Sequence, residues 1–117
     1  MRKYADLKAV ATWRAQQDRC ACCLRLNPMW LQLHHLLGGR VGRPDGAWNC
    51  LALCQECHDR LGHGRENLAI CLTLKRESDP ENYDQAAMQA HLQRFGTELL
   101  PAPAALPDWI LELRGTR

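Results

Sequence analysis

The sequence has 117 residues, of which 46% are hydrophobic and 24% are charged, and this length and composition predict one domain with a modest core. Its apolar runs are too short to cross a membrane, and the N-terminal stretch MRKYADLKAV lacks the apolar segment of a secretory signal. We therefore expect a cytoplasmic protein with no membrane partner. The seven cysteines are an odd number in a compartment that keeps thiols reduced, which favours metal binding over disulfides.

The net charge of +2 is distributed unevenly along the chain. Residues 1–76 contain twelve Lys and Arg against six Asp and Glu, whereas residues 77–117 contain three against seven. A basic segment attracts polyanions and raises their rate of association, and this one also holds all the paired metal-ligand candidates. The pattern favours a nucleic-acid partner, although a solvated surface of uneven charge would give the same totals.

The first half of the chain predicts a helix followed by a compact ββα unit. Apolar spacing, glycines and prolines indicate helix, knuckle, strand, loop, strand and helix in that order, over 4–18, 20–23, 30–37, 38–47, 48–54 and 55–62. Gly62 should end the last helix. Adjacent residues of a strand point to opposite faces, so His34 and His35 should serve different purposes.

The second half should be largely helical. Residues 66–77 favour a helix by their length, although their alternating apolar residues also fit a strand. Asp79 and Pro80 suit the cap and first turn of a helix that reaches about Phe95. A stiff connector (101–107) and a short helix (108–115) follow. We divide the chain into a unit of residues 1–78 and a helical extension of residues 79–117, which packs on that unit or forms a homodimer contact.

Two C-x-x-C pairs, separated by thirty residues, predict a closed tetrahedral zinc site. The four ligands would be Cys20, Cys23, Cys54 and Cys57. Such a structural site stabilises a small domain by on the order of 10 kcal/mol. Cys22 is a competing ligand to Cys23, but the C-x-x-C spacing favours Cys23. Cys50 and Cys71 lie in apolar stretches and are expected to pack in the core.

The zinc site leaves the nearby histidines unexplained, because four cysteines already complete its tetrahedron. His34 and His35 lie on the first expected strand, and His58 follows the last cysteine at the start of a short helix. A single histidine would more often have a structural role. Three at the junctions of a ββα unit, in the basic part of the chain, favour a second site that stays open to a substrate.

These motifs resemble the HNH endonuclease family, whose fold is the ββα-metal nuclease fold. The resemblance runs from C-x-x-C at residue 20 through LQLHHLLGG to WNCLALCQECH, within residues 20–63. It implies a small α+β domain in which the ββα-metal unit carries a structural zinc and is flanked by an N-terminal helix and C-terminal helices.

The resemblance also implies a role for each motif residue. His35 matches the general base that takes a proton from the attacking water, and a neutral imidazole suits that task. His34 and His58 match the ligands of a catalytic divalent cation, Mg2+ or another such as Mn2+. Asn49 matches an asparagine that ties the loop to the unit and helps to hold the base. The family often has a further ligand at the position of Gly62; His63, one residue later, is a possible substitute.

The implied activity is metal-dependent hydrolysis of DNA phosphodiester bonds, by nicking or double-strand cleavage. Four arginines are candidates for phosphate contacts, namely Arg40, Arg43, Arg60 and Arg65. No separate recognition module is visible, so strong sequence specificity is not expected. The alternative is a zinc-stabilised nucleic-acid-binding module without catalysis, which would need the four cysteines but not the histidines.

Overall fold

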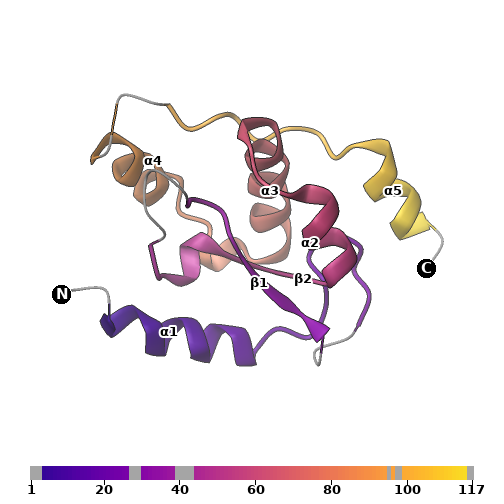
Figure 1. Cartoon of the computed structure of the whole chain (residues 1–117), viewed down its shortest axis with the longest axis horizontal. Coiled ribbons are helices and arrows are strands. Elements are labelled where there is room, and N and C mark those ends of the chain that lie inside the picture. The colour runs from indigo at the N-terminus through magenta and orange to yellow at the C-terminus, as the bar shows by residue number, and fades with distance from the viewer. Residues whose placement is uncertain (1–3, 27–29, 39–43, 95, 97–98, 116–117) are drawn as a thin grey trace.

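The computed structural model describes residues 4–26, 30–38, 44–94, 96 and 99–115, and it confirms a small α+β fold. Five α-helices, two 3-10 helices and two strands occur within these ranges. In chain order they are α1 (Tyr4–Ala15), β1 (Gln32–His35), η3 (Ala47–Asn49), β2 (Cys50–Leu53), α2 (Gln55–Leu61), α3 (Arg65–Ser78), η4 (Pro80–Asn82), α4 (Gln85–Arg94) and α5 (Asp108–Gly115). Figure 1 shows the helices arranged around the β1–β2 hairpin.

The two strands pair in antiparallel fashion, from Gln32 opposite Leu53 to His35 opposite Cys50. Both are shorter than predicted. At the end of β1 and the start of β2, the Asn49 side chain bonds the backbone in place of a strand pair. Its Oδ1 accepts from the Leu37 amide at 2.7 Å, and its Nδ2 donates to the Leu37 carbonyl at 3.0 Å. Backbone groups that bond to a side chain no longer pair with the neighbouring strand. Residues 47–49, directly before β2, form the 3-10 helix η3.

Helix α2 begins directly after β2 and contacts both strands, so the predicted ββα connectivity is confirmed. Its end is also as predicted: Gly62 has a φ of 57°, a left-handed value that glycine adopts without strain. Helix α3 settles the alternative left open for residues 66–77, because it is helical throughout and buries one face. The strand interpretation of this segment is wrong.

Two predicted helix boundaries are corrected by the structure. Helix α1 ends at Ala15 rather than at residue 18. The helix expected from Asp79 is divided into η4 and α4, because the Asp79 carboxylate accepts hydrogen bonds from Lys75, Trp13 and Asn82 and does not cap a helix. Asp84 is the cap instead, with its Oδ1 accepting from the Ala87 amide at 3.0 Å. The predicted end near Phe95 lies outside the described residues.

Helix α5 packs on the ββα unit of its own chain. Ile110 is fully buried, and the Arg60 guanidinium of α2 lies 4.2 Å from the centre of the Trp109 ring. The Arg114 guanidinium donates to the carbonyls of Cys22 and Ala21 at 2.8 and 3.2 Å. Helix α5 therefore lies beside α2 (Figure 1); the division into two units and a homodimer contact stay predictions. None of the described helices has the length and apolar character needed to span a bilayer.

A buried lysine, which sequence analysis did not anticipate, connects α3 to the hairpin. Lys75 is 0% exposed, and its ammonium donates to the Ala47 carbonyl at 2.7 Å, the Cys50 carbonyl at 2.8 Å and the Asp79 carboxylate at 2.7 Å. Burial lowers the pKa of Lys75, while the bond to Asp79 opposes this shift. Since an ammonium has three donors, this group is fully satisfied and holds both ends of η3.

Candidate metal centre and histidine site

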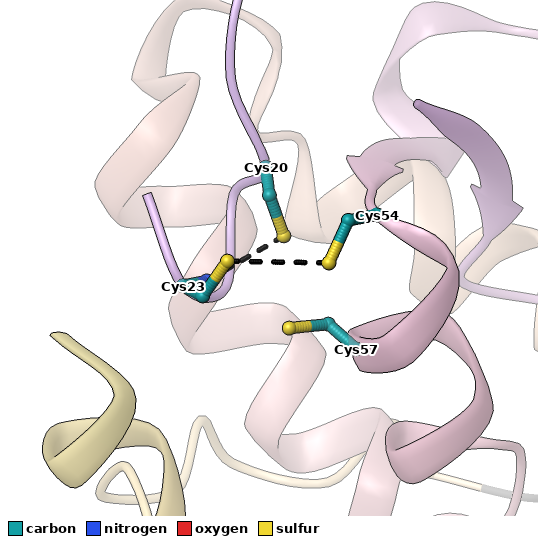
Figure 2. Close-up of side chains that lie close together, drawn as sticks. All are labelled: Cys20, Cys23, Cys54 and Cys57. Atoms are coloured by element: carbon teal, nitrogen blue, oxygen red, sulfur yellow. Dashed lines mark hydrogen bonds between the residues drawn. The ribbon is translucent and has the colours of Figure 1, made fainter. Parts of the chain in front are cut away.

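Four cysteines from two separate segments converge on one point (Figure 2). Their sulfurs all lie within 4.8 Å of one another and all four residues are buried. Zinc bound to four thiolates at about 2.3 Å would place the sulfurs about 3.8 Å apart, and the Cys23 and Cys54 sulfurs are already 4.0 Å apart. The predicted set of Cys20, Cys23, Cys54 and Cys57 is confirmed as a cluster that can hold a metal ion.

The local backbone explains why these cysteines face one another. The Cys20 carbonyl accepts from the Leu24 amide at 2.9 Å, and the Cys20 sulfur lies 3.5 Å from the Cys23 amide nitrogen, so the first pair closes a tight knuckle. Leu24 completes this turn at a φ of 69°, a conformation that costs a non-glycine residue about 1–2 kcal/mol. Cys54 is the N-cap of α2, which brings Cys57 to the same side one turn later.

The chemistry of the thiols also fits a cation. A hydrogen bond with Cys57, followed by burial, raises the pKa of Cys20 to about 12, and burial raises the pKa of Cys54. Four such groups ionise together only when a bound cation compensates for their charge. The remaining thiols are buried. Cys22 hydrogen-bonds Cys57 from outside the four-membered set.

Three histidines lie close together in a group that we call the histidine cluster: His34, His58 and His63. The ring centres of His34 and His58 are 5.2 Å apart, and those of His34 and His63 are 5.3 Å apart. Imidazoles bound to one metal at about 2.1 Å have ring centres roughly 5 Å apart. His34 is 3% exposed, whereas His63 is exposed, so the cluster extends from the core to the surface.

The position of His63 depends on the glycines on either side of it. Gly62 has φ and ψ of 57° and −149°, and Gly64 has 120° and 163°. Both conformations are close to those open essentially to glycine alone. This turn brings His63 onto the His34 ring, with 17° between the ring planes. The expected substitute for the missing motif residue therefore lies against His34.

The buried member of the cluster is held neutral. Burial, with further contributions from the charges of His58, His63 and His35, lowers the pKa of His34 to about 4. A neutral imidazole has the lone pair that metal binding requires. The nitrogens of the histidine cluster are farther apart than the sulfurs of the four cysteines. Among the described residues, only the four cysteines bring three or more potential ligand atoms within 4.8 Å of one another.

His35 faces a different neighbour, as the alternation along β1 predicts. Its Nε2 lies 3.8 Å from the Asp45 carboxylate, and its side chain is 12% exposed. Asn49 is fully buried and also donates to the Pro44 carbonyl at 3.0 Å. Its side chain therefore bonds both Leu37 and Pro44, the residues on either side of 38–43.

The arginine candidates are placed only in part. Arg40 and Arg43 lie outside the described residues. Arg60 lies on Trp109 and 3.7 Å from Glu56, and Arg65 donates to the Leu99 carbonyl at 2.8 Å. Both make contacts within the chain, and their role toward a nucleic acid stays a prediction.

Two neighbours of the histidines were not anticipated from the sequence. Asp45 lies in the glycine-rich loop, where its proximity to His35 depends on how the loop closes. Cys71 lies in α3, where its sulfur is 3.7 Å from Nε2 of His34. A residue fourteen positions beyond the last motif cysteine has no sequence signal that connects it with β1.

Comparison with known proteins does not identify a family. No family model matches the chain, and neither the curated proteins nor the solved structures contain a significant match. The functional interpretation therefore depends on the residues and their geometry.

Proposed function

We propose that this protein is a metal-dependent DNA endonuclease of HNH type, with a structural zinc on the four cysteines and a catalytic divalent cation, Mg2+ or Mn2+, on the histidine cluster. One observation carries the proposal. A single β-hairpin and the helix that follows it bring His34 together with His58 at 5.2 Å, while the adjacent His35 faces Asp45. Hydrolysis of a phosphodiester uses a general base and a divalent cation within reach of the same phosphate, and adjacent residues of one strand end would supply both.

The chain's own residues would divide the work as follows. His35 accepts the proton of the attacking water, with the Asp45 carboxylate orienting its ring and stabilising the imidazolium that forms. Asn49 holds the strand end and loop that carry these two groups, through bonds to Leu37 and Pro44. A cation held by His34 and His58, and by His63 after a small movement, would supply electrostatic stabilisation of the phosphate charge and leaving oxygen.

The zinc would have a structural purpose. It would join the knuckle at Cys20 to the start of α2, and α2 carries His58. Holding α2 against the hairpin fixes the distance between His58 and His34. The zinc therefore supports the histidine cluster without touching a substrate, and its loss should unfold the small domain.

DNA is the proposed substrate because the ligands lie in the basic part of the chain. Residues 1–76 have twelve Lys and Arg against six Asp and Glu, and such a charge attracts the phosphate backbone regardless of sequence. Arg40 and Arg43 follow His35 by five and eight positions in the sequence. A monomer has one such site and would nick one strand per event.

Conversion of supercoiled plasmid to nicked circle tests the proposal. Wild type and His35→Ala are purified in parallel, without tags, and assayed with Mg2+ and with Mn2+ after zinc content and folding have been checked. We expect metal-dependent nicking by the wild type and a loss of about 100-fold or more in His35→Ala.

His91→Ala provides the matched control, because His91 is a half-buried histidine on α4 whose ring lies near Trp48, outside the proposed machinery. It should nick like the wild type. Equal nicking by all three proteins would refute the assignment of His35. DNA binding without nicking by the wild type would instead favour the zinc-stabilised binding module.

A further inference from the structure

Among the described residues, Cys71 is the cysteine whose sulfur contacts the buried His34 ring. It belongs to α3, outside residues 20–63, and is 1% exposed. Its Sγ is 3.7 Å from Nε2 of His34, within hydrogen-bond distance for sulfur. His34 is 3% exposed, so water does not readily replace this contact.

The two ring nitrogens of His34 differ in their hydrogen-bond partners. Nε2 faces the Cys71 sulfur, whereas Nδ1 is buried without a hydrogen-bond partner among the described residues. A neutral imidazole has one N–H group and one lone pair. If the proton were on Nδ1, a buried donor would lack an acceptor. If it is on Nε2, the sulfur accepts it and the lone pair of Nδ1 stays available. The centre of the His34 ring is 5.2 Å from that of His58 and 5.3 Å from that of His63.

We infer that Cys71 is a positioning residue for the histidine cluster: its sulfur accepts the Nε2–H of His34, which fixes the tautomer and directs the Nδ1 lone pair to a divalent cation. The inference builds on the proposed function, since it concerns the same metal. It adds a residue from α3 that the motif does not contain, and it specifies which nitrogen of His34 binds.

The expected effect follows from the general behaviour of metal-bound histidines. The nitrogen that does not bind the metal almost always donates to an acceptor, and removal of that acceptor typically lowers metal affinity 10- to 100-fold. Without the sulfur, the His34 ring can turn and its proton can move to Nδ1, and both changes oppose binding. Cys71 acts through His34 and touches neither metal nor substrate.

The test compares Cys71→Ala with Cys71→Ser, because alanine and serine are closely matched in size but only serine retains an acceptor. Untagged, zinc-loaded proteins are titrated with Ni2+, which suits imidazole ligands, by calorimetry, and zinc content is measured before and after. We expect Cys71→Ala to bind Ni2+ 10- to 100-fold more weakly than wild type and Cys71→Ser to recover most of the loss. The same order should appear in the Mn2+ concentration that half-activates nicking, with smaller changes at saturating Mn2+.

Equal weakening in both variants would overturn the inference, because it would show that Cys71 contributes only volume. Unchanged affinity in both would overturn it as well. If Cys71→Ala does not fold, Cys71→Val and Cys71→Thr form a second matched pair that differs in the hydroxyl acceptor. A third outcome separates the two proposals. If Cys71→Ser recovers Ni2+ binding but the wild type cleaves no DNA, the role of Cys71 is supported and the nuclease function is refuted.

Discussion

Replacing Lys75 by methionine should cause a large loss of stability, even though a buried lysine is often regarded as a liability. Methionine retains an unbranched apolar chain of similar size but removes all three donors. The carbonyls of Ala47 and Cys50 and the carboxylate of Asp79 then lose the partner that they have at 2.7–2.8 Å. Breaking a buried charged pair by removing one partner costs about 3–5 kcal/mol, a substantial part of the total of about 5–15 kcal/mol for a small domain.

Urea unfolding of zinc-loaded protein, followed by tryptophan fluorescence, measures this loss. Arg76→Met is the matched control, since Arg76 is the next residue of α3 and is exposed; it should change the free energy of unfolding by less than about 0.5 kcal/mol. A Lys75→Met variant as stable as the control would refute the reasoning and would mean that the buried ammonium is no better than an apolar group.

A double-mutant cycle separates the ion pair from the carbonyl contacts. Asp79→Asn removes the carboxylate charge but retains an oxygen that can accept from Trp13, whose Nε1 lies 2.7 Å from it in the wild type. We expect Lys75→Met and Asp79→Asn to couple by about 1–3 kcal/mol, with the double variant more stable than the sum of the two losses predicts. Strict additivity would exclude the pair as the source of the effect.

Three further outcomes are expected. Cys23→Ala should lose zinc and unfold, whereas Cys22→Ala, at a position equally buried but outside the ligand set, should retain one zinc per chain by elemental analysis; zinc retained in Cys23→Ala would mean that the ligands were wrongly chosen. The pKa of His34 is lowered to about 4 from an ordinary 6.5, so His34 gains a proton at a higher pH in the unfolded chain than in the folded one. The free energy of unfolding is therefore unaffected by His34 above pH 6.5 and falls by up to about 3 kcal/mol as the pH is lowered toward 4. Urea titrations of His34→Leu should lack that part of the pH dependence, and parallel profiles for the two proteins would contradict it. Leu24→Gly should raise the free energy of unfolding by up to about 1 kcal/mol, because it relieves the left-handed φ of 69°; a loss of stability would show that the side chain packs more than its 39% exposure suggests.

Much of the local structure of the ββα unit could be predicted from the sequence. The cysteine spacing identified the four members of the buried cluster, because two knuckles that close on one metal are each a local structure. The strand–loop–strand–helix order and the end of α2 at Gly62 also followed from local patterns. Alternation along one strand predicted that His34 and His35 face different neighbours.

The boundaries of several elements could not be predicted, because side chains distant in sequence decide them. Asp79 resembles a helix cap by its local sequence, but its carboxylate accepts a hydrogen bond from Trp13, which lies 66 residues away, as well as from Lys75. The hairpin ladder ends at β1 and begins at β2 where Asn49 bonds the backbone of Leu37. In each case the competing hydrogen bond comes at least partly from another segment of the chain.

The same division applies to the candidate site. Residue types and spacing identified the histidines of the cluster, since their chemistry is visible in the letters themselves. Only the tertiary structure brought Asp45 to His35 and Cys71 to His34, and only it turned His63 onto the His34 ring. The physical reason is that a ligand's identity belongs to its side chain, whereas the partners that orient it are set by the packing of α3 and the loop against the hairpin.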